Sequence, residues 1–232
     1  MKRTIAIALI ILFSFCYIEC ICLAEGELTV TSKNAIIKNG KDSGMFVGKV
    51  ENTGDEPIYY DNGKCVILSD NDEILATENY VSSSPGDILL QPGEYTYVYE
   101  SLWSNPLKNA TIGDIKFSVT SGSRGYTYDQ LPATADLELP GSGAFKYNYV
   151  NVTFTNTTDE ILFGAYVVCA LMDENENIIF VDRDRYDYIG IHPGSTVTIK
   201  KYIESDYMDY YEINNIKISK VDALVYINGS KQ

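Results

Sequence analysis

Positive charge and histidine are scarce in this sequence. The 232 residues include 18 Lys and Arg against 32 Asp and Glu, with a single His, which gives a net charge of −14 at pH 7. A chain with this balance repels the phosphate backbone of nucleic acids, so we do not expect nucleic-acid binding. Anionic wall polymers and anionic lipid surfaces are disfavoured for the same reason. Cationic partners, divalent ions and neutral glycans remain open.

The sequence also lacks the common catalytic patterns. With His192 as its only histidine and no serine nucleophile elbow, it gives no support to a serine hydrolase. No Gly-rich loop follows a predicted strand and opens a helix, which argues against nucleotide chemistry. Carboxylates are too numerous for a glycosidase pair to be judged by counting, and none is marked out by its context. We therefore predict a protein that is not an enzyme and carries no cofactor.

Cysteine is rare beyond the N-terminus. Three of the five cysteines precede residue 25, which leaves Cys65 and Cys169. An even number of cysteines in an oxidising compartment suggests a disulfide. In alternating strands, however, Cys65 shares a face with Ile67, and Cys169 shares one with Leu171, so each thiol points into a predicted core. We expect two separate buried free thiols.

A long apolar run occurs only at the N-terminus, from Thr4 to Ile18, after two positively charged residues. Together with the small residues Cys22 and Ala24, this pattern predicts a signal peptide over residues 1–24 that is cleaved after Ala24. An uncleaved membrane anchor is the alternative, although the run is shorter than the roughly 20 residues of a spanning helix. We expect the protein to be extracellular or at the cell-envelope surface.

Helical periodicity is missing from the rest of the chain. Short runs rich in Val, Ile, Tyr, Phe and Thr alternate with Gly, Pro, Asn and Asp, as in MFVGKVEN, EYTYVYESL and YNYVNVTFTN. Many short strands separated by turn residues are typical of antiparallel β-sandwiches. We predict an all-β protein with little or no helix.

An internal repeat divides the chain into two similar parts. At an offset of 104 residues, NTGDE from Asn52 and Cys65 are matched by NTTDE from Asn156 and Cys169. Further on the offset becomes 101, where Pro92-Gly93 is matched by Pro193-Gly194. The repeat predicts two tandem domains, residues 25–130 and 131–232. The short connection between them suggests that they are closely coupled.

Both repeats resemble the FxLYD domain family. MFVGKVENTGDE is similar to the family's Val-x-Gly-x-Val-x-Asn strand and turn, and CALMDENENII is similar to its signature, with Cys169 in the Phe position. The first repeat departs from the pattern with Ser69 in the Asp position, and the second with Val152 in the Gly position. The resemblance implies immunoglobulin-like antiparallel sandwiches, found outside bacterial cells, with no established activity and no catalytic residues to transfer.

Two acidic segments and the histidine are possible metal ligands. SDNDEI from Ser69 and MDENENI from Met172 contain oxygen ligands suited to Ca²⁺. Neither has the spacing of an EF-hand loop, and both lie where a hairpin turn is expected, which favours Asp and Asn for backbone reasons. His192 precedes a Pro-Gly pair and is read as a turn residue. We predict no metal site.

Tyrosine is abundant, with 19 residues, and several follow each other at a spacing of two. Residues at this spacing lie on one face of a strand. Such faces could stack on sugars or anchor a protein partner, or they could cover an outer sheet or the seam between the domains. The acidic segment ESDYMDYYE, from Glu204, is either an acidic, tyrosine-rich contact loop or a solvated connection, and we favour the solvated connection. The candidate ligand surface consists of Tyr95, Tyr97, Tyr99, Tyr186 and Tyr188.

The sequence therefore predicts a non-catalytic, secreted or envelope-associated protein that acts as a protein-interaction or structural module. The alternative is a glycan-binding module that uses tyrosine platforms, with or without Ca²⁺. The expected partner is an extracellular or envelope protein, or a neutral glycan. Contact with a membrane is expected only through an uncleaved signal segment.

Overall fold

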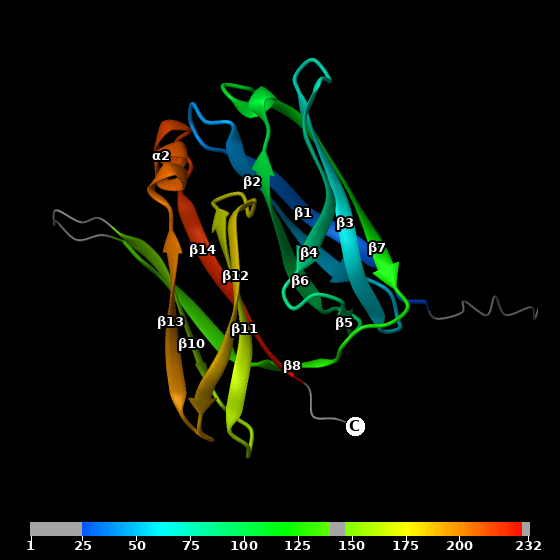
Figure 1. The fold of residues 1–232 in the computed structure, drawn as a ribbon, viewed down its shortest axis with the longest axis vertical. Helices are drawn as coiled ribbons and strands as arrows, with labels where there is room; N and C mark the ends of the chain where they lie inside the picture. The colour runs from blue at the N-terminus through cyan, green and yellow to red at the C-terminus, as the bar shows by residue number, and fades with distance from the viewer. Residues whose placement is uncertain (1–24, 140–146, 229–232) are drawn as a thin grey trace, which may run out of the picture.

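The computed structural model describes residues 25–139 and 147–228, and the predicted signal peptide lies outside these residues. The described chain is mostly β-structure in several antiparallel sheets, with one short α-helix, so the prediction of a β-protein is confirmed at this level. Figure 1 shows two β-rich halves side by side, which we call the N-terminal half (residues 25–122) and the C-terminal half (residues 128–228).

The N-terminal half contains one sheet in the order β1-β2-β6-β4-β3-β5, with β7 also paired to β3. Strand β4 pairs with β3 along most of its length, but Ser82 and Ser83 pair with Tyr99 and Val98 of β6. The sheet thus forms two layers joined by β4 (Figure 1). Its elements are β1 (Leu28–Ile37), β2 (Ser43–Asn52), β3 (Ile58–Ser69), β4 (Ile74–Ser83), β5 (Ile88–Leu90), β6 (Tyr95–Trp103), a 3₁₀ turn (Asn105–Leu107) and β7 (Ile112–Gly122).

The C-terminal half contains a three-stranded sheet, β13-β10-β9, and a four-stranded sheet, β12-β11-β14-β8. Strand β8 begins before the predicted boundary at residues 130 and 131 and ends just after it. It pairs with β14 of the C-terminal half. The sheets of this half therefore begin at Tyr128. Its elements are β8 (Tyr128–Leu131), β9 (Ala133–Glu138), β10 (Asn148–Thr155), β11 (Leu162–Asp173), β12 (Ile178–Ile191), β13 (Thr196–Ile203), α2 (Ser205–Ile213) and β14 (Ile218–Asn228).

A buried asparagine has the same role in each half. The Asn52 side chain donates to the carbonyls of Glu56 and Leu90, at 2.8 and 2.9 Å. Asn156 donates to the carbonyls of Glu160 and Ile191, both at 2.8 Å. Both asparagines are fully buried. The same hydrogen bonds therefore occur in both halves, between residues that are related by offsets of 104 and 101. The sequence repeat thus corresponds to a repeated structural unit.

The two acidic segments form hairpin turns, as predicted. In the first, the Ser69 hydroxyl accepts hydrogen bonds from the backbone N–H groups of Asn71 and Glu73, at 3.2 and 3.1 Å. In the second, the Asp173 carboxylate accepts the equivalent bonds from Asn175 and Asn177, at 2.8 and 2.9 Å. Ser69 therefore performs in the first turn the role that Asp173 has in the second.

We expect Ser69→Ala to lower the free energy of unfolding by about 1 kcal/mol, because two backbone donors lose their acceptor at a partly exposed turn. Ser69→Asp should cost little, since Asp173 already fills this role in the second hairpin. Urea unfolding of the three proteins provides the measurement. Equal loss of stability in both variants would contradict the assignment of Ser69 as the acceptor in this turn.

Both cysteines of the described chain are free and fully buried, which confirms the expected thiols. Burial raises the pKa of Cys65 to about 11, and it also raises the pKa of Cys169. Because the thiolate is the reactive form, neither residue is suited to be a nucleophile. Each behaves as a small core side chain.

The interpretation of ESDYMDYYE as a solvated connection is wrong. Residues Ser205–Ile213 form helix α2, with Tyr207 and Tyr211 buried. The Tyr211 hydroxyl donates to the carbonyl of Ile179 at 2.6 Å. These tyrosines are four residues apart and therefore lie on one helix face. The helix is short and rich in acidic residues, so this spacing was not recognised as a helical pattern in the sequence.

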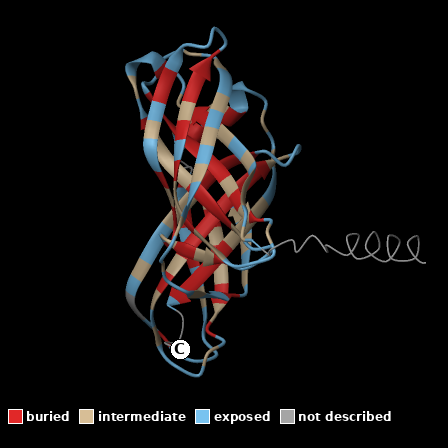
Figure 2. Cartoon of the chain, turned by 90° about the vertical axis from the view of Figure 1, so that its right-hand side faces the viewer, coloured by how far each residue is buried: buried red, intermediate tan, exposed pale blue. Residues whose placement is uncertain are grey.

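The core continues from one half into the other. Strand β2 is buried on both faces over most of its length, because one face packs inside its own half and the other faces the C-terminal half. Phe46 marks the inner face, where its ring lies 4.7 Å from that of Phe117 in β7. Figure 2 shows buried segments running through the middle of the molecule across both halves.

Candidate functional site

Alternate residues of β6 face the C-terminal half. The first two, Tyr95 and Tyr97, donate their hydroxyls to the same carboxylate oxygen of Asp222 in β14, at 2.8 and 2.7 Å. Tyr97 is only 1% exposed. Burial, and then the bond to Asp222, raise the pKa of Tyr95 to about 12. These two rings are therefore contacts between the halves.

The third residue of this face, Tyr99, makes a cation–π contact with Arg183 of the C-terminal half. The Arg183 guanidinium is 5.2 Å from the centre of the Tyr99 ring. The same guanidinium donates to the carbonyls of Ser82 and Ser83 at 2.6 and 2.8 Å, and to the Ser82 hydroxyl at 2.9 Å. Arg183 therefore connects β12 with Ser82 and Ser83, the end of β4 that pairs with β6.

The two remaining candidate tyrosines lie on β12. Tyr186 is half-buried, and the ammonium of Lys201 is 5.9 Å from its ring centre. Lys201 is 4% exposed and pairs with Asp182 at 3.0 Å and with Asp184. Burial lowers the pKa of Lys201, but these carboxylates outweigh it and raise the pKa to about 12. The side chain of Tyr188 lies outside the described part of the structure.

The structure therefore places Tyr95, Tyr97 and Tyr99 in the contact between the halves and places Tyr186 beside a buried ion pair. A more open site begins further along the same face of β6. Here a cleft of about 250 Å³ separates the halves. We call it the interhalf cleft. Its lining includes Lys38, Tyr99, Ser101 and Trp103 from the N-terminal half, and Asp182, Tyr202, Glu204 and Tyr207 from the C-terminal half.

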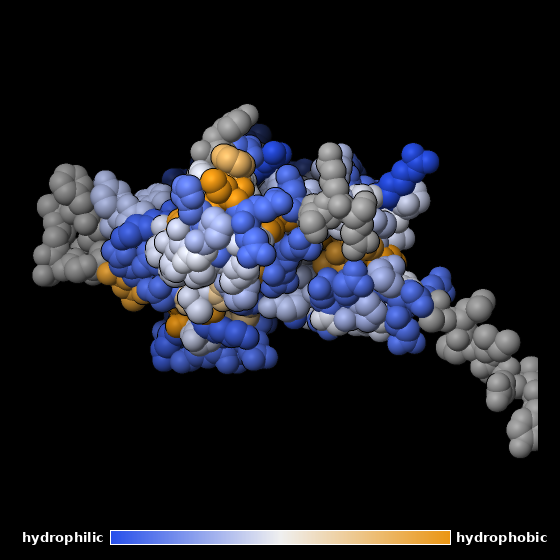
Figure 3. Space-filling model, turned by 90° about the horizontal axis from the view of Figure 1, so that it is seen from below, coloured by the Kyte–Doolittle hydropathy of each residue, from blue (hydrophilic) through white to orange (hydrophobic). Residues whose placement is uncertain are grey.

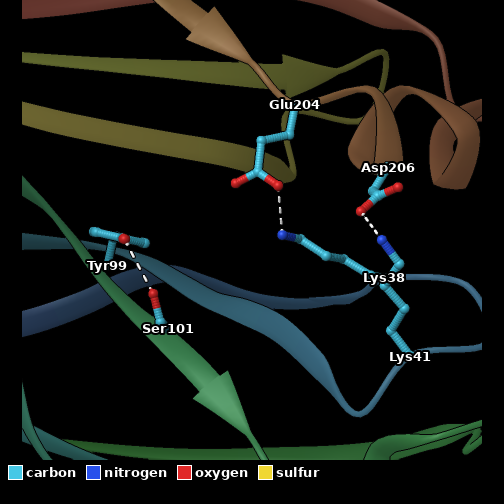
Figure 4. Close-up of polar contacts among 6 residues, drawn as sticks. All are labelled: Lys38, Lys41, Tyr99, Ser101, Glu204 and Asp206. Carbon is cyan, nitrogen blue, oxygen red and sulfur yellow. Dashed lines mark hydrogen bonds and ion pairs between the residues drawn. The ribbon is translucent and has the colours of Figure 1, made fainter.

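Two ion pairs connect the halves beside the interhalf cleft (Figure 4). Lys38 donates to Glu204 at 2.6 Å, and its ammonium lies 4.8 Å from the centre of the Tyr207 ring. Lys41 pairs with Asp206 in the first turn of α2. The Tyr99 hydroxyl shares a hydrogen bond of 3.1 Å with Ser101, which also lines the cleft. The geometry of the cleft is thus fixed by contacts from both sides.

Two aromatic side chains at the cleft are open to solvent. Trp103, the only tryptophan of the chain, is 71% exposed, and Tyr202 from the opposite half is 43% exposed. Sequence reasoning missed both. The signal for Trp103 was present, because it shares the strand face of Tyr95, Tyr97 and Tyr99 at the same spacing of two.

The chemistry offered by the interhalf cleft is that of binding. It combines aromatic faces with a hydroxyl, an ammonium and two carboxylates, which together recognise a polar surface with apolar parts. Among residues 25–139 and 147–228, no group of three or more His, Cys, Asp or Glu side chains is arranged to hold a metal ion. His192 lies exposed in the turn before β13, where its carbonyl accepts a hydrogen bond from Ser195 at 3.0 Å.

Within the described ranges, no helix has both the length and the apolar character needed to cross a bilayer. Seen from below the view of Figure 1, the surface is largely hydrophilic with separate hydrophobic patches (Figure 3). Comparison with known proteins found no family model and no curated protein that matches this chain.

Proposed function

We propose that this chain is a non-catalytic protein-interaction module, secreted or held at the cell envelope. It consists of two tandem immunoglobulin-like sandwiches of the FxLYD type that are joined into a single rigid unit. The repeated asparagine and turn geometry supports the tandem organisation, and the layered antiparallel sheets support a sandwich in each half. The motifs that resemble the FxLYD family support its assignment.

The rigidity of the unit follows from the nature of the contact between the halves. Buried tyrosines, a multiply bonded arginine and a continuous apolar core connect them. Large apolar contacts of this kind oppose relative domain motion. A surface that receives residues from both halves therefore has a fixed shape, which lowers the entropic cost of binding a partner.

The exposure of Trp103 beside the interhalf cleft is the observation that carries the proposal. Tryptophan and tyrosine are enriched among the residues that dominate binding energy at protein interfaces. A tryptophan that is 71% exposed contributes little to its own fold, and here it lies at a cleft with Tyr202 on the other side. We infer that a protein partner inserts an apolar or basic side chain between them.

Charge favours a basic partner. Glu204 and Asp182 line the cleft, where they pair with Lys38 and Lys201, and the exposed Asp209 lies on α2, the helix that follows Glu204. Acidic residues outnumber basic ones over the whole chain, and the net charge of −14 attracts Lys and Arg side chains during encounter. Association should therefore slow as salt is added.

Site-specific crosslinking tests the proposal. A photocrosslinking amino acid in place of Ser101, which lines the cleft and is half-buried, should capture a partner from the native envelope. The affinity of the purified partner should then fall about tenfold or more in Trp103→Ala, because a central aromatic contact is lost. The control is Tyr80→Ala, which truncates a ring that is 59% exposed on β4 and should leave binding unchanged. Equal affinity in wild type and Trp103→Ala would overturn the proposal.

A further inference from the structure

We propose that a neutral glycan binds on the outer face of the sheet β13-β10-β9, at a cluster formed by Tyr147, Tyr149 and Tyr202. This site shares Tyr202 with the protein contact at Trp103, but Tyr147 and Tyr149 belong to it alone. We call these three residues the tyrosine cluster.

The three rings lie together at one end of the sheet. Tyr149 and Tyr202 are directly opposite each other in the register of β10 and β13, and their ring centres are 5.9 Å apart. The ring of Tyr147 lies 6.2 Å from Tyr149 and 5.8 Å from Tyr202. Tyr147 is 49% exposed and Tyr202 is 43% exposed. Clustered, partly open tyrosine rings offer apolar faces to the C–H groups of a sugar while their hydroxyls stay polar.

Comparison of the two halves makes the cluster stand out. The equivalent outer face in the N-terminal half is covered by the C-terminal half and carries Ile36, Met45 and Val47, which are all fully or nearly fully buried. In the C-terminal half the described residues of this face are exposed or half-buried, and its central rows are polar: Thr153 with Thr198, and Asn151 with Lys200. Large aromatic residues at one end of an open polar face are therefore not explained by packing between the halves.

Polar groups beside the rings have the variety that sugar hydroxyls require. Asn151 donates to Asp136 and Glu138, at 3.3 and 3.2 Å, and Lys200 donates to Glu138 at 2.6 Å. The ammonium of Lys200 also lies 5.3 Å from the centre of the Tyr149 ring. Carboxylate, amide and ammonium groups together can accept from and donate to neighbouring hydroxyls.

One acceptor next to the tyrosine cluster has no partner. The side-chain oxygen of Asn151 is buried and makes no hydrogen bond within the described residues. Leaving a buried acceptor unpaired is costly, so a group that reaches it is favoured. Lys200 is opposite Asn151 in the register and is half exposed, so its flexible side chain can move to admit a ligand hydroxyl.

Charge selects a neutral ligand at this face. Beside the tyrosine cluster, the negative charges of Asp136 and Glu138 exceed the positive charge of Lys200. Because the whole chain also has a net charge of −14, an anionic polysaccharide is repelled. The tyrosine cluster is compact, with ring centres 5.8 to 6.2 Å apart, so one sugar residue can contact more than one ring while its neighbours extend over the polar rows of the sheet.

Titration calorimetry with the protein lacking residues 1–24 tests this proposal. The probes are cellohexaose, mannohexaose and N-acetylchitohexaose, with an oligogalacturonate as the anionic control. We expect at least one neutral hexamer to bind and the oligogalacturonate not to bind. The double variant Tyr147→Ala/Tyr149→Ala should lower the affinity about tenfold or more. Asn151→Ala, a smaller change, should lower it several-fold, and circular dichroism of each variant checks that it is folded.

Two variants separate this proposal from the protein contact. Trp103→Ala should retain glycan affinity, whereas the tyrosine double variant should retain the crosslinked protein partner. Loss of glycan binding in Trp103→Ala alone would place the sugar in the interhalf cleft and overturn the assignment to the tyrosine cluster. Absence of binding by every neutral hexamer at millimolar concentration would also overturn it, as would an unchanged affinity in the double variant. Either result leaves the protein contact to be judged by its own crosslinking experiment.

Discussion

Asn156→Ala is expected to lower the free energy of unfolding by about 4 kcal/mol, because three buried or partly buried backbone groups lose their partner at about 1–3 kcal/mol each. The Asn156 side chain donates to the carbonyls of Glu160 and Ile191, and its oxygen accepts from the backbone N–H of Thr158 at 2.9 Å. Alanine can replace none of these bonds. Asn52→Ala should have a similar effect in the N-terminal half. Chemical denaturation followed by tyrosine fluorescence gives the measurement.

The matched control is Asn175→Ala. Asn175 is exposed in a turn of the same half, and its bond to Asp173 uses the backbone N–H, which alanine keeps. We expect a change of less than about 0.5 kcal/mol, as is usual for surface substitutions. If Asn156→Ala were as mild as this control, the loop hydrogen bonds of the repeat would not be the element that stabilises each unit.

The repeat made much of this architecture predictable. A short motif that recurs at a constant offset needs the same local geometry twice, and the turns and buried cysteines follow from strand alternation around it. Ser69 shows where a simple motif comparison is too strict. The hydroxyl of Ser69 accepts the same two backbone bonds as the carboxylate of Asp173, so a departure from the family pattern preserves the turn.

The candidate site was harder to predict, because the repeat hides a difference between the halves. Equivalent outer faces belong to β6 and β13, but only the face of β6 is covered by the other half. The sequence recorded this difference: Tyr95, Tyr97 and Tyr99 occupy on β6 the positions that Thr196, Thr198 and Lys200 occupy on β13. The face of β6 that is covered carries aromatic residues, and the exposed face of β13 carries polar residues, as expected from their burial. Alternation along one strand shows which residues share a face, but it does not show whether the other half covers that face.

The pH dependence of the second hairpin turn also follows from its geometry. Partial burial raises the pKa of Asp173, but the hydrogen bonds from Asn177 and Asn175 outweigh burial, so the pKa lies below its ordinary value. A carboxylate with a lowered pKa stabilises the folded state above its unfolded pKa of about 3.9, and this contribution is lost as the pH falls through the folded value. The serine of the first turn does not titrate, so acid should weaken the second hairpin more than the first.

Tyr97→Ala is expected to lower the free energy of unfolding by about 4 kcal/mol, since truncation of a fully buried aromatic side chain leaves a cavity. Tyr97 is 1% exposed, and its hydroxyl donates to Asp222 in the C-terminal half at 2.7 Å. Tyr97→Phe keeps the ring and removes only the hydroxyl, so it should cost about 1.5 kcal/mol. Calorimetric unfolding of both variants gives the comparison.

The control for Tyr97 is Tyr80→Ala, which removes a ring that is 59% exposed and should change stability by less than about 0.5 kcal/mol. The order of effects decides between two roles for the β6 tyrosines. A surface platform for ligands would tolerate Tyr97→Ala as well as it tolerates Tyr80→Ala, whereas a contact between the halves would not. Because Tyr95 and Tyr97 share the same Asp222 oxygen, the loss in the double variant Tyr95→Phe/Tyr97→Phe should differ from the sum of the two single losses. Strict additivity would mean that the two hydroxyls act independently and that the shared carboxylate does not link the halves as one unit.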